Sequence, residues 1–366
     1  MKKLPLTLAA TLALVVLVQT TAQACTTFCL FHGKDLIFGR NYDFPIGYGH
    51  VIINKRGVMR TATANEGEIA AQWTSKYGSL TFNQFGRDLP TGGMNETGLI
   101  VELSQLDATQ YPSADSRPAL GSLEWIQYQL DNAATVQEVM QLAEKVRIRS
   151  HVGIHFLVAD SKGEIASVEF LNGKLVTHSG EQMPMKALAN STYEESLAHL
   201  QRFAGKAALP NSMSSLDRFV RAGVMAKNYK PNAGKSAIDY SFDILRNVAQ
   251  GAHTQWSIVY DVRNRAVHFF TSKAQRVRHV SLKSFDFNCA SPVKILEVNA
   301  DLTGDVAAQF NDYLHAANRA LVFASFQNSP FTKQVPVSAL EEIAKHPERS
   351  ACRQVAVEAA KTATNK

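Results

Sequence analysis

Residues 25–43 read CTTFCLFHGKDLIFGRNYD. Two runs of apolar and β-branched residues flank the turn-forming His32-Gly33-Lys34, and this pattern predicts a β-hairpin. The second strand ends in a segment that contains Arg40 and Asp43. Because the hairpin folds that strand back along the first one, we expect both side chains to lie near Cys25. A thiol, a guanidinium and a carboxylate are thus predicted at one end of two paired strands.

The segment before Cys25 has the layout of a secretory signal peptide. Two lysines precede an apolar run over residues 4–18, and Ala22-Gln23-Ala24 ends the segment in a small-x-small pattern. The run is shorter than the about 20 apolar residues that a membrane-spanning helix needs. We therefore predict that residues 1–24 are removed by cleavage between Ala24 and Cys25. The mature chain would then be periplasmic or secreted, with no stable membrane span.

Cleavage at this point would give Cys25 a free α-amino group, so one residue would carry both a nucleophile and a base. An unperturbed thiol has a pKa of about 8.5 and an α-amine one of about 7.7–8.0, so the amine can take the thiol proton near neutral pH. A nearby cation favours the thiolate, and a carboxylate can hold the amine. Arg40 and Asp43 are the candidates for these roles. This chemistry requires neither a metal nor an organic cofactor.

Composition places the chain among soluble globular proteins, with 45% hydrophobic and 19% charged residues. The formal net charge is +6, but the basic residues are scattered rather than clustered, which argues against a nucleic-acid partner. We find no repeat, linker or change in composition after the signal segment. Residues 25–366 are therefore predicted to form one domain, with a frayed Ala-rich tail at about residues 353–366.

Blocks of strands and blocks of helices alternate along the chain, which favours a layered α+β architecture. The residues up to Leu106 are rich in strands, with a turn-rich segment at Thr91–Gly98, and two further groups of strands follow near residues 152–177 and 256–270. Helices are expected near Ser122–Leu130, Thr135–Val146, Tyr193–Phe203, Ser214–Lys227, Ala237–Ala249, Asp305–Ala317 and Val337–Ala344.

Five segments, in order along the chain, resemble the choloylglycine hydrolase family. They are Cys25-Thr26-Thr27, Gly39–Asp43, Gly93–Leu99, Ala189-Asn190-Ser191 and Asp217-Arg218-Phe219. This family contains the bile salt hydrolases and penicillin V acylases, within the N-terminal-nucleophile (Ntn) hydrolases. The resemblance implies an αββα sandwich, with two antiparallel sheets between helical layers, and the hydrolysis of linear amide C–N bonds.

The resemblance also implies a role for each matching position. Cys25 is the nucleophile and its amine the base, while Arg40 and Asp43 steady the thiol and the amine. The Asn190 side chain donates to the oxyanion, and Arg218 orders the network around it. A second oxyanion donor in the family is a backbone N–H, which falls at Gln105 in this chain. Family members often form tetramers, so a homotetramer is an expectation from the resemblance.

Several departures from the family pattern bear on the substrate. Asn190 is followed by Ser191-Thr192 without the family's proline, and the segment from Asn190 to Arg218 is shorter than in bile salt hydrolases. Gln105 stands where the family has Asn, Tyr or Trp. The shorter segment reshapes the pocket and, together with export, favours penicillin V, N-acyl homoserine lactones or another N-acyl amide. Conjugated bile salts are the alternative substrate class.

A rival of another class concerns Cys25 itself. In bacterial lipoproteins the cysteine after the signal is acylated and its amine is blocked, which would make this chain a lipid-anchored binding protein without catalysis. A typical lipoprotein signal has Leu three residues before that cysteine, whereas this chain has Ala22. The sequence therefore favours the enzyme over the lipoprotein.

Other candidate residues have ordinary structural interpretations. His151, His155 and His253 lack the spacing of a metal motif and are interpreted as ordinary histidines. Cys29 is interpreted as a buried apolar residue, and a disulfide between Cys289 and Cys352 is left open because spacing does not determine pairing. Core packing is favoured over lining of an acyl site for four aromatic residues, namely Trp73, Phe82, Phe85 and Trp125.

Overall fold

The computed structural model describes residues 25–33, 35–206, 208–231 and 234–353. The predicted signal segment and nearly all of the predicted frayed tail lie outside these residues. Within them, two large sheets lie face to face. The first has the strand order β14 (Ala187–Leu188), β1 (Thr26–His32), β2 (Asp35–Asp43), β15 (Thr254–Asp261), β16 (Ala266–Thr271), β17 (Arg278–Ser281) and β19 (Gly304–Asp305).

The second large sheet is longer and supplies the opposite wall. Its strand order is β13 (Lys174–Ser179), β12 (Ile165–Leu171), β11 (Ile154–Ala159), β8 (Ile100–Gln105), β7 (Gly92–Asn95), β6 (Ser79–Asn83), β3 (His50–Asn54), β18 (Lys294–Glu297) and β20 (Asn311–Asp312). Two small sheets join β21 (Ala351–Cys352), β4 (Val58–Thr61) and β5 (Gln72–Thr74), and β9 (Ala119–Leu120) with β10 (Arg147–Ile148).

The predicted hairpin is confirmed as the pair β1 and β2. Thr27 lies opposite Arg40 and Thr26 opposite Asn41 in an antiparallel register. Gly33 in the turn has φ +58°, a left-handed conformation that glycine adopts without a Cβ penalty. Lys34, the last residue of the predicted turn, lies outside the described residues.

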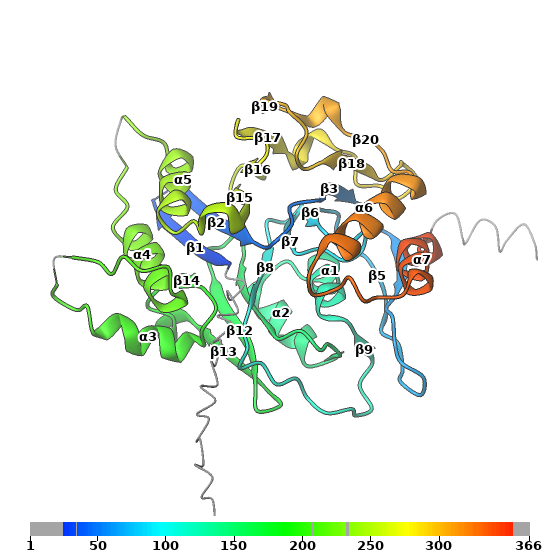
Figure 1. Ribbon diagram of the computed structural model, residues 1–366, viewed down its shortest axis with the longest axis horizontal. Helices are drawn as coiled ribbons and strands as arrows, with labels where there is room; N and C mark the ends of the chain where they lie inside the picture. The colour runs from blue at the N-terminus through cyan, green and yellow to red at the C-terminus, as the bar shows by residue number, and fades with distance from the viewer. Residues whose placement is uncertain (1–24, 34, 207, 232–233, 354–366) are drawn as a thin grey trace, which may run out of the picture.

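Helices cover the outer faces of both sheets, which confirms the αββα sandwich (Figure 1). On the first sheet, α4 (Ser215–Lys227) packs on β1 and β14, α5 (Ala237–Asn247) packs on β2 and β15, and α3 (Tyr193–Gln201) packs beside α4. On the second sheet, α1 (Ser122–Asn132) packs on β7 and β8, followed by α2 (Val136–Ala143). The predicted capping box of α2 is present, since the Thr135 hydroxyl accepts from the Glu138 N–H.

Alternation along β8 shows how one strand serves two layers. Val101 and Leu103 belong to the apolar cluster that includes Trp125 of α1, whereas Ile100 belongs to the cluster between the sheets. Glu102 points to the same inner side as Ile100, because side chains two residues apart share a face of a strand. A buried carboxylate therefore faces the first sheet.

Two local predictions were wrong. The predicted helix at Asp305–Ala317 is replaced by β19, a 3₁₀ turn at Ala307–Gln309 and β20, and the helix α6 begins only at His315. The Asp305 carboxylate accepts from the Ala307 N–H, a local side-chain bond that competes with helix formation. The turn-rich segment at Thr91–Gly98 contains the strand β7, which pairs with β6 and β8.

The C-terminal part of the chain forms a helical pair, α6 (His315–Asn328) and α7 (Val337–Lys345), on the side of the molecule away from α3 (Figure 1). Cys289 and Cys352, whose pairing the sequence left open, form a disulfide that encloses this pair in one covalent loop. Among the described residues, no helix is long and apolar enough to cross a bilayer.

Candidate active site

The site lies where strands from both sheets end. Cys25 directly precedes β1, and Asp43 is the last residue of the antiparallel β2. Asn190 follows the short β14, the neighbour of β1 in the same sheet. In the facing sheet, β8 ends at Gln105. Arg218 reaches the same place from α4. The fold thus gathers all six predicted site residues at one edge of the sandwich, although they lie as far apart in the chain as Cys25 and Arg218.

Cys25 is buried, with 4% of its surface exposed. Burial raises the pKa of its thiol, while the Arg40 charge lowers the pKa. Hydrogen bonds from the Arg40 side chain and the Asp43 backbone amide also lower it. By contrast, burial raises the pKa of Cys29 to about 12, so this second thiol stays protonated and inert, as an ordinary core residue.

A carboxylate from the facing sheet holds Arg40 in place. The Arg40 guanidinium forms an ion pair with Glu102, and both side chains are fully buried. Its Nη1 also donates to the Thr91 carbonyl oxygen at 2.8 Å, and the Tyr260 hydroxyl donates to Glu102. Pairing lets a buried guanidinium keep its charge, which lies beside the thiol. Sequence reasoning missed Glu102; an acidic residue inside the buried run Leu99–Leu106 was the available signal.

The glycine of β7 makes room for this ion pair. A Cβ added at Gly92 would overlap the Glu102 carboxylate, so any other residue there would displace the partner of Arg40. Asn95 has a structural role in the same segment, since its Oδ1 accepts from the Leu99 N–H and its Nδ2 donates to the Leu130 carbonyl. The family-like Gly93–Leu99 segment therefore supports the site without entering it.

Asp43 sits on the opposite face of β2, toward α4 and α5. Its carboxylate accepts from the Thr254 hydroxyl and, at 3.2 Å, from the Gln250 side-chain amide. Burial raises the pKa of Asp43 to about 6, and the two hydrogen bonds and the charge of Arg218 act against this rise. At neutral pH the carboxylate is ionised and can hold an ammonium group.

Arg218 links Cys25 to Asn190, the residue expected to donate to the oxyanion. Its Nη1 donates to the Cys25 carbonyl oxygen at 2.9 Å and to the Thr26 hydroxyl, and its Nη2 donates to Asn190 Oδ1 at 2.9 Å. Burial lowers the pKa of Arg218 to about 10, so it remains a cation at neutral pH. One guanidinium thus sets the position of Asn190 relative to Cys25.

The orientation of Asn190 follows from these bonds. Because its Oδ1 accepts from Arg218, its Nδ2 is the donor end, and it donates to the Gln105 carbonyl oxygen at 2.8 Å. The Asn190 backbone N–H donates to the Ser215 hydroxyl at 2.7 Å. The side-chain amide is therefore held as a donor at the end of β8.

The backbone amide of Gln105 points to the same side as Asn190. Leu106 donates to Gly153 beside β11, whereas Leu103 donates in the other direction, to Thr91. Amide directions alternate along an antiparallel strand, so the Gln105 N–H points with that of Leu103, away from β11. The Gln105 carbonyl that accepts from Asn190 lies on this side too. Two donors, one side-chain and one backbone, thus meet at this edge.

A buried histidine and carboxylate support the Asn190 segment from behind. His155 Nε2 lies 2.8 Å from the Ala189 carbonyl oxygen and must donate to it, while Nδ1 lies 3.0 Å from Glu169 Oε1. The same Glu169 oxygen accepts from the Tyr193 N–H at 3.0 Å. The pair therefore fixes the backbone on both sides of Asn190, a structural role that the sequence did not reveal.

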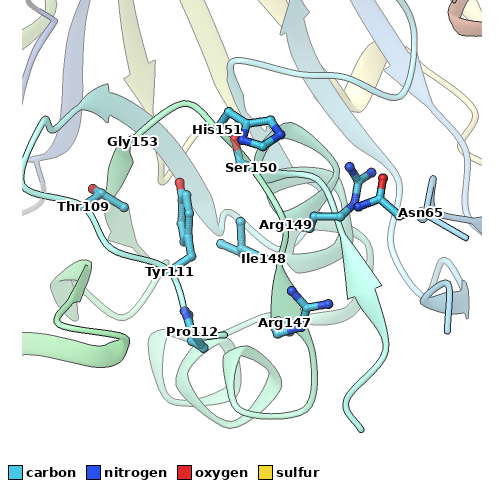
Figure 2. A pocket seen from close by; sticks show the side chains of 10 residues that line it. All are labelled: Asn65, Thr109, Tyr111, Pro112, Arg147, Ile148, Arg149, Ser150, His151 and Gly153. Carbon is cyan, nitrogen blue, oxygen red and sulfur yellow. The ribbon is translucent and has the colours of Figure 1, made fainter. Parts of the chain in front are cut away.

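The described residues contain no group of three or more His, Cys, Asp or Glu side chains placed to hold a metal ion. A cavity of about 290 Å³ lies beyond the Gln105 end of β8, lined by Thr109, Tyr111, Arg149 and Gly153 among others (Figure 2). None of the six predicted site residues lines it. The residues that the sequence predicts for the site therefore lie outside this cavity.

Comparison with known proteins decides the family. The profile described as linear amide C–N hydrolases, choloylglycine hydrolase family, matches residues 25–205 and 184–295. This chain belongs to that family. It is therefore an amidohydrolase of linear C–N bonds, as the five sequence segments predicted.

Individual relatives agree with this assignment. The chain is 29% identical over 266 residues to a penicillin V acylase of Pectobacterium atrosepticum, covering 60% of this chain and 70% of the relative. It is also similar to the structure of penicillin V acylase from Agrobacterium tumefaciens, with TM-score 0.70, 29% identity and coverage of 79% and 98%. A variant of the conjugated bile acid hydrolase from Clostridium perfringens shares the fold, with TM-score 0.64, 19% identity and coverage of 76% and 98%.

Proposed function

We propose that the processed chain hydrolyses N-acyl amides of the penicillin V type, with Cys25 as an N-terminal nucleophile. One observation carries this proposal: the buried Cys25 thiol lies against Arg40, while Arg218 ties the Cys25 backbone to Asn190. This arrangement supports Cys25 as the nucleophile, Arg40 as the cation that favours its thiolate, and Asn190 with the Gln105 N–H as the oxyanion donors. The family match begins at residue 25, which supports processing at that position.

In the first half of the reaction, the Cys25 α-amine takes the thiol proton, and Sγ attacks the carbonyl carbon of the amide. The C=O π electrons move to oxygen, and the Asn190 side chain and the Gln105 N–H donate to this oxyanion. The C–N bond then breaks as the α-ammonium returns its proton to the departing amine. A thioester between Cys25 and the acyl group remains.

In the second half, water attacks the thioester carbon and the same α-amine takes its proton. The C–S bond breaks, the thiol is restored and the carboxylic acid leaves. Asp43 holds the ammonium that forms in each half, and Arg40 stabilises the thiolate. Glu102 acts through Arg40 and is a positioning residue.

The penicillin V assignment rests on two relatives of that name at 29% identity. N-acyl homoserine lactones, like penicillin V, carry an apolar acyl group in amide linkage to a polar amine. They are the second substrate class to test. Conjugated bile salts are disfavoured by the short segment between Asn190 and Arg218. A homotetramer is proposed on family resemblance alone.

The test is a hydrolysis panel with the mature enzyme. It contains penicillin V, short- and long-chain acyl homoserine lactones, and taurine- and glycine-conjugated bile salts. We expect activity on at least one of the first two classes, its loss in Cys25→Ala and severe impairment in Cys25→Ser, because a hydroxyl is a poorer nucleophile here. Normal turnover by Cys25→Ala would refute the mechanism, and inactivity on the whole panel would refute the substrate assignment.

Processing is a separate part of the proposal. We propose export and cleavage between Ala24 and Cys25, which places the mature enzyme in the periplasm or outside the cell and leaves the uncut precursor inactive. Intact-mass measurement of the mature protein tests this directly. A mass that starts at an unmodified Cys25 is expected, whereas an added acyl-chain mass on Cys25 would favour the lipid-anchored binding protein.

A further inference from the structure

A row of aromatic side chains runs from the site to the surface. Tyr42 stacks on Phe44 with ring centroids 5.7 Å apart, and Phe44 meets Phe85 at 5.7 Å. Phe44 also meets Phe331 at 6.0 Å, and Phe85 meets Phe326 at 5.3 Å. Burial decreases along the row, because Tyr42 is 3% exposed, Phe44 and Phe85 are half-buried, and Phe331 is 62% exposed. The row therefore presents an apolar surface to solvent.

The inner end of this row lies beside the nucleophile. Thr26 pairs with Asn41, so one residue further along the register Cys25 lies opposite Tyr42. Directly opposite residues share a face and have Cβ atoms about 4.5–5.5 Å apart. Phe44 follows the end of β2, one strand spacing from the nucleophile's strand, which is about 4.8 Å. Phe44 also lies two residues beyond Tyr42, about 7 Å further along the strand direction, so an extended acyl group on Sγ is needed to reach it.

The second sheet brings Phe85 to the same edge. Phe85 follows the end of β6, and β6 and β8 are separated by the single strand β7. Two strand spacings put the end of β6 about 10 Å from Gln105 along the edge. Phe85 and the Gln105 amide therefore lie at separate positions along the same edge of the second sheet.

The outer end of the row comes from the pair α6 and α7, beyond residue 295 where the family match ends. Asn318 of α6 fixes this pair, since its Oδ1 accepts from the Arg87 N–H at 2.7 Å and its Nδ2 donates to the Ala344 carbonyl at 3.0 Å. The disulfide from Cys289 to Cys352 closes the same segment onto the body. Phe331, in the connection between the two helices, is therefore held against Phe44 by tertiary structure.

We propose that Phe44, Phe85 and Phe331 form the binding surface for the apolar acyl group of the amide, and that Phe331 determines acyl specificity. This inference rests on the proposed function. The acyl half of the substrate stays on Cys25 as a thioester, while the amine half takes a proton and departs. The enzyme therefore needs an apolar surface near Cys25 that keeps the apolar acyl group bound. Aromatic faces take both phenyl rings and alkyl chains. The C-terminal helical pair is thereby an extension of the site that sets its substrate range.

The test compares acyl groups on one constant amine. The rates of hydrolysis of the acetyl, octanoyl and phenoxyacetyl amides of the penicillin nucleus are measured for the wild type and for Phe331→Ala. We expect kcat/KM to fall by about 2- to 12-fold for the octanoyl and phenoxyacetyl substrates, the range typical of one aromatic contact, mainly through KM. The acetyl substrate is too short to reach Phe331 and should be hydrolysed as by wild type.

Leu314→Ala is the matched control. Leu314 lies at the N-terminus of α6 and is 64% exposed. Its replacement by Ala therefore removes a comparable exposed apolar side chain from the same helical pair. It should leave all three substrates unchanged. Thermal denaturation of both variants should match wild type, because both side chains are largely exposed.

Three results would overturn the inference while leaving the proposed function intact. They are equal effects of Phe331→Ala on all three substrates, no effect on any of them, or a smaller assembly in sedimentation, which would make Phe331 a contact between copies of the chain. A wild-type enzyme inactive on every N-acyl amide would instead refute the proposed function, and the inference with it.

Discussion

Replacing Asn190 with Ala tests the oxyanion assignment most directly. Its Nδ2 lies 2.8 Å from the Gln105 carbonyl oxygen, and its Oδ1 accepts from Arg218 at 2.9 Å. In the transition state the Nδ2 donor turns to the new oxyanion. Losing one such donor costs about 10²–10³ in kcat, or roughly 2.7–4 kcal/mol. KM should change little, because the negative oxygen exists only after attack.

The same change has a smaller effect on folding. Arg218 loses one acceptor but keeps the Cys25 and Met213 carbonyls and the Thr26 hydroxyl. A buried group that loses one partner costs about 1–3 kcal/mol, and the remaining acceptors place this case at the low end. Urea denaturation therefore separates the catalytic loss from the structural one.

Gln105→Ala is the matched comparison for Asn190→Ala. Its proposed donor is the backbone N–H, which survives the substitution, so kcat should fall by far less than the about 10² that the loss of a donor costs. Steady-state kinetics on the best panel substrate, run alongside the denaturation curves, gives both numbers. A loss of kcat below about tenfold in Asn190→Ala, in a protein shown to be folded, would refute the reasoning.

Three further predictions concern electrostatics and the disulfide. The double variant Arg40→Met with Glu102→Gln removes both members of the buried charge pair. The pKa of the Cys25 thiol should rise in this variant, because the Arg40 charge lowers that pKa in the wild type. The pH dependence of thiol alkylation measures the pKa, and an unchanged midpoint would contradict the prediction. In the uncleaved chain, where Cys25 has no α-ammonium group, the pKa of Asp43 is about 6 in the folded state against 3.8 in the unfolded state, so the folded state binds more protons between these values. The free energy of unfolding should therefore fall by up to about 3 kcal/mol as pH rises through this window, and Asp43→Asn should remove that decline in urea denaturation at pH 4 to 7. Replacing both Cys289 and Cys352 with Ser opens a covalent loop whose ends are separated by 63 residues in the sequence. The free energy of unfolding should fall by about 4 kcal/mol, because the unfolded chain gains conformational entropy. A reductant should therefore destabilise the wild type but not the double variant.

Part of the site follows from local sequence. The Gly33 turn between two β-branched and apolar runs predicts a hairpin, and the hairpin register returns Arg40 and Asp43 to Cys25. These contacts are short-range, so backbone pairing and side-chain alternation determine them. Assignment of Asn190, Arg218 and the Gln105 backbone required the family resemblance, because their separation in the chain carries no local signal.

Only the tertiary structure decided which groups tune those residues. Glu102 reaches Arg40 across the two sheets, and Gly92 leaves the space that the Glu102 carboxylate fills. His155 and Glu169 brace the backbone beside Asn190 from the second sheet. Such contacts depend on how two sheets pack face to face, which residue spacing does not encode.

The hairpin that follows Cys25 could be predicted from local sequence, because its two strands and its turn are close together in the chain. The same stretch of sequence supports the proposed nucleophile and the proposed processing site. The tertiary structure alone decided the buried charge partner of Arg40 and the path by which Phe331 reaches Phe44. It also decided the Cys289–Cys352 pairing. Burial, which raises the pKa of the Cys25 thiol, and the facing charges that lower it exist only once both sheets have packed.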